Sequence, residues 1–322
     1  MYSKERKMKK LILVPFLIAL LTTSFTFAKD AEKIGILVLT HGSKEKSWSE
    51  TVENATKEIK ERFPVAIVFG KANPVTMQKG IDTLENQGIN KIVVVQLFIS
   101  SYSPIIRQNE YLLGLRKELA DPPISMMHNE SGDTEKGNNH QKKINLKQLQ
   151  INAKIVLTKP LDAHLFVTHT LFNRMTDLSK DPSNETVIIV AHGPNGREDN
   201  KSLIAMMDKL SDQIKKLQVA NGENYKQIFT TTVRDDANPE TYEKTKQYLR
   251  KLVSQAGKDG EVIVIPLLLS NAGIEEVFVK RSEGLDYKWS GKTVLPDSII
   301  AKFIEESVNS KVVKITPFNS TR

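Results

Sequence analysis

The sequence predicts an α/β fold with two tandem, similar domains, each with a roughly four-stranded parallel sheet covered by helices on both faces. Three observations support this fold class. Short unbroken apolar runs, such as "IGILVLT" (34–40) and "VIIVA" (187–191), are typical of parallel strands buried on both faces. Segments with apolar residues at helical spacing alternate with these runs. Finally, the same order of motifs occurs twice along the chain.

Each half begins with a strand that runs into His-Gly, and each second strand leads into the tripeptide Ala-Asn-Pro. The alternation predicts four strands and four helices per half. In the first half we expect strands at 34–40, 65–70, 90–100 and near 155, and helices at 47–63, 75–88, after the third strand and up to 175. In the second half we expect strands at 187–191, 227–233, 261–270 and 293–296, and helices at 200–217, 240–257, from 275 and up to 308.

These patterns divide the chain into three parts. Residues 1–28 are expected to be a signal peptide, 29–180 the N-terminal domain and 181–322 the C-terminal domain. A polar stretch at 128–148 lacks hydrophobic periodicity and is interpreted as a solvated insertion in the first domain.

The first 28 residues have a basic start, an apolar centre and small residues before a possible cleavage point at Ala28. Cleavage predicts a periplasmic or secreted protein with no stable membrane span. An uncleaved segment would instead anchor the chain to the membrane, although Pro15 weakens a spanning helix.

Composition excludes several classes of function. Removal of residues 1–28 lowers the formal net charge from +8 to +4, which argues against a nucleic-acid partner. The chain has no cysteine, so any metal must be bound by nitrogen and oxygen ligands. It also lacks a phosphate-binding loop and a dinucleotide glycine fingerprint, so neither ATP nor a nicotinamide or flavin cofactor is expected.

The two strand-end histidines, His41 and His192, are the first candidates for chemistry, because ligands bind at the carboxyl ends of parallel strands. In the second half Glu275 follows the third strand, and neighbouring strands would bring it near His192. An imidazole facing a carboxylate can hold a divalent metal or accept protons. The structural alternative is that the histidines are packed rings and that Glu275 only begins a helix.

The motifs "LVLTHGS", "IIVAHGP" and "PLLLSNAG" resemble those of the class II chelatases, which insert a divalent metal into a tetrapyrrole without ATP. The resemblance covers residues 34–308 and is closest to two-domain sirohydrochlorin cobaltochelatases and ferrochelatases. It implies insertion of Co²⁺ or Fe²⁺ into a sirohydrochlorin-like ligand in the cleft between the domains, by a monomer or homodimer. His192 and Glu275 would handle the metal and the pyrrole protons, with a lesser contribution from His41.

The resemblance also implies basic side chains for the carboxylates of the macrocycle. Those in strand-end loops are Arg107, Arg197, Arg234 and Arg281. The sequence departs from the family pattern because a second histidine that many cobalt-inserting members carry is replaced by Glu275, and the first half has no counterpart. An exported tetrapyrrole- or metal-binding protein that lost catalysis is therefore the alternative.

Overall fold

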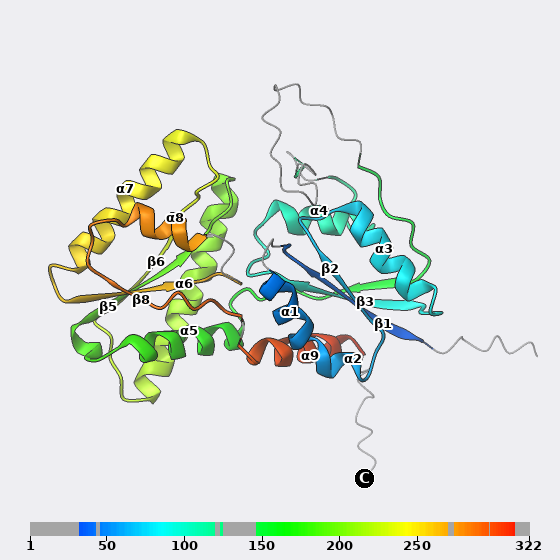
Figure 1. Ribbon diagram of the computed structural model, residues 1–322, viewed down its shortest axis with the longest axis horizontal. Coiled ribbons are helices and arrows are strands. Elements are labelled where there is room, and N and C mark those ends of the chain that lie inside the picture. The colour runs from blue at the N-terminus through cyan, green and yellow to red at the C-terminus, as the bar shows by residue number, and fades with distance from the viewer. Residues whose placement is uncertain are drawn as a thin grey trace, which may run out of the picture. The chain divides into compact units, whose positions relative to one another are not determined.

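The computed structural model describes residues 32–42, 46–119, 123–124, 146–269, 274–295 and 297–312. The expected signal peptide and most of the polar insertion lie outside these residues. Residues from Glu32 onward form one compact unit, which contains two parallel sheets (Figure 1).

The first sheet has the strand order β2-β1-β3-β4, and all its neighbours are parallel. Its strands are β1 (Ile34–Thr40), β2 (Val65–Phe69), β3 (Lys91–Leu97) and β4 (Lys154–Leu157). The second sheet has the equivalent order β6-β5-β7-β8. Its strands are β5 (Glu185–Ala191), β6 (Gln227–Thr232), β7 (Glu261–Pro266) and β8 (Lys288–Trp289). The predicted fold class is therefore confirmed.

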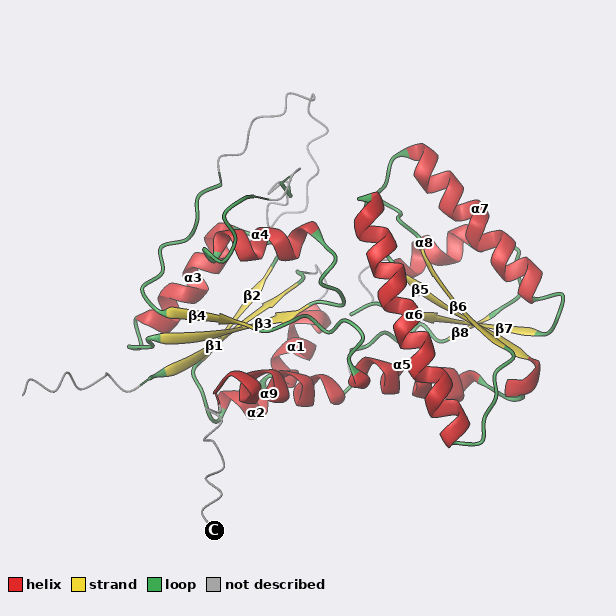
Figure 2. Cartoon of the chain, turned by 180° about the vertical axis from the view of Figure 1, so that it is seen from behind, coloured by secondary structure: helices red, strands yellow, loops and turns green. Residues whose placement is uncertain are grey.

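The helices follow the strands in alternation, as the sequence predicted. They are α1 (Lys46–Ala55), α2 (Lys57–Lys60), α3 (Pro74–Glu85), α4 (Pro104–Leu112), α5 (Leu165–Leu178), α6 (Arg197–Ala220), α7 (Pro239–Ala256), α8 (Ile274–Arg281) and α9 (Ile299–Val312), with a 3₁₀ turn at Pro182–Asn184. Figure 2 shows them around the yellow strands.

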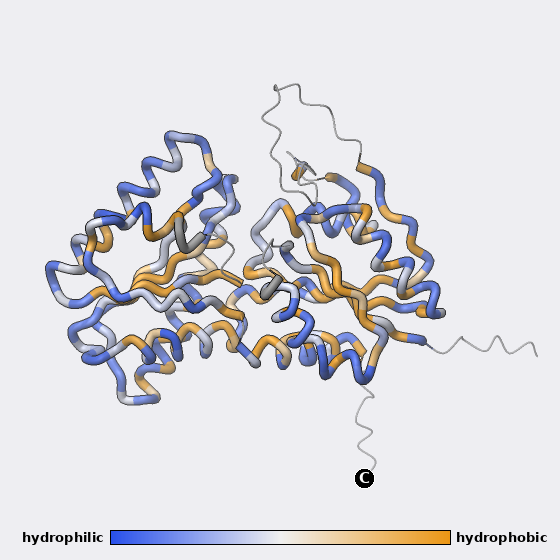
Figure 3. The backbone as a smooth tube through the Cα atoms, in the orientation of Figure 1, coloured by the Kyte–Doolittle hydropathy of each residue, from blue (hydrophilic) through white to orange (hydrophobic). Residues whose placement is uncertain are grey.

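Both faces of each central strand are buried, which explains why the strands are apolar without alternation. In β1, Val38 packs into one apolar cluster with helices α1 and α2, whereas Leu39 packs into another with α3 and α4. In β5, Ile189 and Val190 divide in the same way between two clusters. The strands accordingly stand out as the most hydrophobic part of the tube in Figure 3.

The repeated Ala-Asn-Pro tripeptide is a helix start. Asn73 and Asn238 are the N-caps of α3 and α7, and the following proline takes the first helical position in each. The Asn73 side chain accepts a hydrogen bond from the Val75 amide at 2.9 Å, and that of Asn238 from Thr241 at 2.8 Å. The motif therefore fixes the point at which the chain turns back after the second strand of each half.

The last helix of each half packs beyond its own sheet. Helix α5, which ends the first half, contacts β7 and α6 of the second half, while α9, which ends the second half, contacts β3, α1 and α2 of the first. An ion pair of 2.6 Å between Arg62 and Glu305 adds to the α9 contact. The two sheets therefore share one large apolar cluster.

Two elements differ from the sequence prediction. The helix expected at 47–63 is divided into α1 and α2 at the buried Thr56. The Thr56 amide shares its hydrogen bond between the carbonyls of Val52 and Glu53, and the Thr56 hydroxyl also donates to the Glu53 carbonyl. The strand expected at 293–296 is wrong: the fourth strand is the two-residue β8 at 288–289. Val294 and Leu295 still bond to the carbonyls of Leu268 and Leu269, but outside a regular ladder.

No helix within the described ranges is both long and apolar enough to cross a membrane.

Candidate metal site at the end of the second sheet

His192 follows β5, the strand flanked by β6 and β7, so its ring emerges at the carboxyl edge of the second sheet. The ring Nδ1 lies 2.8 Å from the carbonyl oxygen of Gly193. If Nδ1 carries the proton and donates it there, Nε2 is left as the atom that can bind a proton or a metal.

Gly193 is required by the shape of this turn. Its φ is +81°, a left-handed conformation that favours glycine, and an added Cβ would lie 2.6 Å from Cβ of Thr232. Gly42, the corresponding glycine after His41, has an ordinary φ and would place a Cβ no closer than 3.5 Å to Gly70. The same dipeptide therefore meets different constraints in the two halves.

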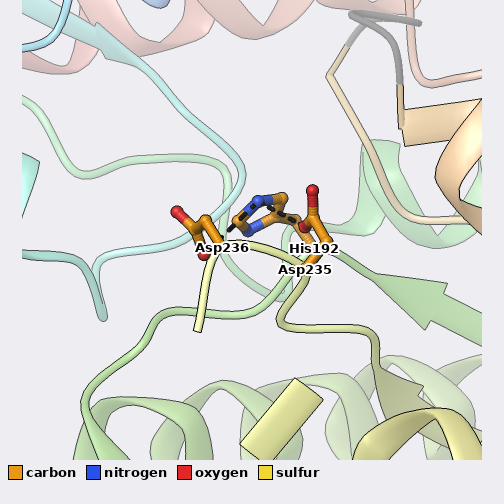
Figure 4. A group of neighbouring side chains, drawn as sticks. All are labelled: His192, Asp235 and Asp236. Carbon is orange, nitrogen blue, oxygen red and sulfur yellow. Dashed lines mark ion pairs between the residues drawn. The ribbon is translucent and has the colours of Figure 1, made fainter. Parts of the chain in front are cut away.

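The loop after β6 brings two carboxylates to His192. The Arg234 amide donates to the His192 carbonyl at 2.6 Å, and Arg234 has a φ of +46°, which turns the chain back toward the ring. As a result Nε2 of His192 lies 2.8 Å from Oδ1 of Asp235 and 3.8 Å from Oδ1 of Asp236 (Figure 4). The Asp235 side chain is 20% exposed and that of Asp236 is 59% exposed.

The two carboxylates change the titration of the ring. Burial alone would lower the pKa of His192, but the contact with Asp235 and the charges of Asp235 and Asp236 outweigh it and raise the pKa above 6.5. Burial would likewise raise the pKa of Asp235, but the contact with His192 and its charge, aided by the charge of Arg281, lower it. The site therefore favours a cation at Nε2, whether that cation is a proton or a metal.

One nitrogen and two carboxylate oxygens form a ligand set suited to a divalent transition metal. The potential ligand atoms of His192, Asp235 and Asp236 all lie within 4.8 Å of one another. Oδ1 of Asp235 is buried and lies 2.8 Å from Nε2 of His192. The carboxylate is therefore available to a metal.

The structure places the remaining predicted catalytic residues as follows. Glu275 lies in the first turn of α8, but its side chain is outside the described residues. His41 follows β1 as expected, with Nδ1 3.0 Å from the Gly42 carbonyl, the same relation as in His192. The loop after β2 supplies Gly70 and Lys71 before Ala72, so it brings no carboxylate to His41.

The four predicted basic residues have different surroundings. Arg197 is 93% exposed at the start of α6, near Glu198. Arg107 of α4 makes two hydrogen bonds, of 2.8 and 2.9 Å, to the carboxylate of Asp199 in the first turn of α6. Arg234 donates to the carbonyls of Pro194 and Asn195, and Arg281 is fully buried.

The sequence reasoning missed Asp235 and Asp236, although a signal was present. The strand partners Phe69 and Thr232 hold equivalent positions next to the ends of β1 and β5. Two residues separate Phe69 from the following Ala-Asn-Pro, but four separate Thr232 from it. The two additional residues of the second half fall in the stretch that contains the paired aspartates.

Together, the fold and the site define a parallel α/β protein with two equivalent sheets and an imidazole–carboxylate cluster at a strand end. Residues 35–178 match the model of the CbiX family. The chain is also 38% identical over 69 residues to a sirohydrochlorin cobaltochelatase of Sulfolobus acidocaldarius. That match covers 21% of this chain and 56% of the relative. The resemblance to the class II chelatase family is therefore confirmed, although the His192 cluster lies outside the residues that the family model matches.

Two solved structures share the fold. SirB from Bacillus subtilis with Fe³⁺ has a TM-score of 0.56 at 16% identity and covers 87% of this chain and 97% of its own. The sirohydrochlorin chelatase SirB from Bacillus subtilis subspecies spizizenii in complex with cobalt has a TM-score of 0.56 at 13% identity, with coverage of 86% and 95%. At this identity the likeness establishes the architecture of both halves.

Proposed function

We propose that the protein inserts a divalent metal, Co²⁺ or Fe²⁺, into a tetrapyrrole of the sirohydrochlorin type. The family match and the cobaltochelatase relative support the reaction class. The observation that carries the proposal for this chain is the cluster of His192, Asp235 and Asp236 at the edge of the sheet where parallel α/β proteins bind ligands.

In this proposal the metal is a substrate that is first held by Nε2 of His192 and the two carboxylates. Transfer to the macrocycle releases two pyrrole protons for each divalent ion. The same Nε2 and the Asp235 carboxylate, vacated by the metal, would then be available as bases for those protons. Glu275, in the first turn of α8, would supply a further carboxylate to the metal or to the protons.

The basic residues contribute unequally to substrate binding in this proposal. Arg197 is the most exposed of the four and would contact a carboxylate of the macrocycle. Arg107 already binds the carboxylate of Asp199 as a fork, so a substrate carboxylate would have to displace Asp199 from it. Arg234 and Arg281 are engaged with backbone carbonyls and would shape the site instead.

The decisive experiment mixes purified protein with sirohydrochlorin and Co²⁺ or Fe²⁺ and follows the absorbance spectrum. Insertion is expected to replace the spectrum of the free macrocycle by that of its metal complex, faster than in a control without protein. A rate equal to the control would contradict catalysis.

The same experiment separates the main alternative, an exported protein that binds a tetrapyrrole or a metal without turnover. The basic and apolar pattern of residues 1–28 favours this alternative, because tetrapyrrole synthesis takes place in the cytoplasm in most bacteria. A carrier would shift the macrocycle spectrum at once and stoichiometrically, and added metal would not accelerate any further change.

We further propose that residues 1–28 direct export to the periplasm or the medium. Mass spectrometry of protein from its native host is then expected to find a chain that begins near Lys29. Protein that retains Met1 in the cytoplasmic fraction would contradict export.

A further inference from the structure

Arg281, at the end of α8, is the largest of the fully buried side chains and carries a charge. Its guanidinium stacks on Tyr242 of α7, with the central carbon 3.9 Å from the ring centroid. Its Nη1 donates to the Val233 carbonyl and, at 3.2 Å, to the hydroxyl of Thr245. A buried charge is costly unless it is well paired, so these contacts need an explanation beyond stability.

The pairing of this guanidinium is incomplete. Nε and Nη2 make no hydrogen bond to the described part of the chain. A fully apolar side chain at this place would avoid that cost, because buried ionic groups often contribute less to stability than apolar ones of similar size. The position of Arg281 therefore suggests that it holds the neighbouring chain segment after β6 in place.

The segment that Arg281 holds is the loop after β6, which carries Asp235 and Asp236 of the metal site. Val233 lies two residues before Asp235, and its amide donates to the Ala191 carbonyl at 3.0 Å, beside His192. Its carbonyl accepts hydrogen bonds from Arg281 and, at 2.8 Å, from the hydroxyl of Thr245. Val233 is thus held on one side by β5 and on the other by α7 and α8.

This anchoring matters because the next residue is in an unfavourable conformation. Arg234 has a φ of +46°, which a residue with a side chain adopts only when its surroundings enforce it. The left-handed turn is what directs Asp235 back to within 2.8 Å of His192. If the Val233 carbonyl were released, the turn could relax and the carboxylates would move away from the ring.

We infer that Arg281 is the positioning residue of the metal site, which it serves by pinning the Val233 carbonyl and thereby fixing the loop that carries Asp235 and Asp236 against His192. The inference rests on the proposed function for the identity of the site. It also reassigns Arg281, which the sequence placed among the residues that bind the macrocycle.

The test compares Arg281→Met with a matched control, Arg250→Met. Arg250 of α7 donates to the carbonyls of Arg281 and Glu283, both at 2.9 Å, so it secures the end of α8 through bonds that do not involve the β6 loop. Each variant is titrated with Co²⁺ alone. The readouts are the dissociation constant by calorimetry, the visible spectrum of bound Co²⁺, which reports ligand number and geometry, and the melting temperature.

Arg281→Met is expected to weaken Co²⁺ binding by about 10- to 100-fold, the usual effect of losing a residue that orients metal ligands, and to change the spectrum. Arg250→Met is expected to keep both affinity and spectrum even if its melting temperature falls. Thr245→Val removes a hydroxyl that Arg281 and Val233 share. It serves as the second variant if Arg281→Met does not fold, with an expected loss of about 3- to 10-fold.

Unchanged affinity and spectrum in Arg281→Met, or in Thr245→Val where the first variant does not fold, would overturn the inference. A wild-type protein that binds no Co²⁺ would overturn it together with the proposed metal site. A wild-type protein that binds Co²⁺ and loses it in Arg281→Met, yet inserts no metal into sirohydrochlorin, would support the inference and contradict the proposed function.

Discussion

At the scale of single residues, the candidate site of the second half centres on one nitrogen atom. Nε2 of His192 faces Asp235 and Asp236, and any cation placed there is stabilised by both charges. His41 occupies the equivalent place after β1, but the loop beside it supplies no aspartate. The two histidines are therefore expected to differ in function although they share a motif.

The first prediction tests this difference by mutation. His192→Ala and Asp235→Asn are each expected to lower the rate of metal insertion by at least about a hundredfold, because each removes a metal ligand and a proton acceptor. Glu275→Gln is expected to lower the rate as well. The matched control is His41→Ala, whose effect is expected to be much smaller. Equal effects at His41 and His192, measured beside the melting temperatures, would contradict a privileged site in the second half.

The second prediction concerns pH. The raised pKa of His192 means that its proton competes with a metal over a wider pH range, so Co²⁺ affinity is expected to increase as pH rises through that pKa, above 6.5. An NMR titration of the His192 ring checks this, and Asp235→Asn is expected to lower the midpoint. A midpoint that does not move would show that Asp235 is not the partner of the ring in solution.

The raised pKa of His192 also links protonation of its ring to the stability of the folded protein. Because its pKa is higher in the folded than in the unfolded protein, His192 contributes stability that is fully present below its unfolded pKa and is lost as pH rises through the folded value. The apoprotein is therefore expected to gain stability toward acid from this residue, and His192→Ala removes that gain.

The site could be predicted only in part, for physical reasons that are clear at the level of residues. His192 was visible because a polar ring directly after a buried apolar strand must emerge at the sheet edge. Asp235 and Asp236 were hidden because their approach depends on the left-handed turn at Arg234, which no local pattern indicates. Arg281 was visible as a basic residue, but its complete burial depends on contacts with α7 and β6 that only the folded chain provides.

At the scale of elements, the turn after β5 is the part of the site that tolerates a side-chain substitution least. The third prediction is that Gly193→Ala destabilises the protein by about 1–3 kcal/mol and weakens metal binding, because its Cβ would overlap Thr232 and its φ is left-handed. Gly42→Ala is the matched control, since the same change there meets only ordinary contacts. Chemical denaturation of the two variants measures the difference, and equal losses of stability would contradict the structural distinction.

The strands and most helices could be predicted from the sequence because each is a continuous segment with a clear period and a defined end. Asn73 and Asn238 mark helix starts through local hydrogen bonds that depend on residue type alone. The short strand β8 could not be predicted in this way. It consists of Lys288 and Trp289, which pair with Ile263 and Val264, so its existence depends on β7 rather than on its own composition.

At the scale of the whole molecule, the exchange of α5 and α9 joins the two halves into one apolar core. Neither half can keep all of its buried surface without the other. The halves are therefore expected to unfold together, even though each has its own sheet.

The fourth prediction uses the two tryptophans, Trp48 in the first half and Trp289 in the second. Phe303 of α9 is buried in the shared cluster, with His164 of the first half at 5.3 Å between ring centroids. Phe303→Ala is expected to cost about 3–5 kcal/mol and to shift the denaturation midpoints seen by both tryptophans equally.

Single-tryptophan variants, Trp48→Phe and Trp289→Phe, separate the two signals in that measurement. The exposed neighbour Lys302→Ala is the control on the same helix and is expected to move neither midpoint. A shift confined to Trp48 would show that the halves are energetically independent.

The exchanged helices also constrain the order in which the chain can fold during its synthesis. A ribosome has made the first sheet when it has synthesised about half of the chain, but one face of that sheet is covered in part by α9, which begins only at Ile299. The nascent first half must therefore leave part of that face exposed until nearly the whole chain has emerged, a period in which it is open to aggregation and to capture by chaperones. Its own last helix, α5, meanwhile lacks its main partners, β7 and α6, until they are made. A chain that looks like two domains in its sequence thus has to complete both of them almost at the same moment.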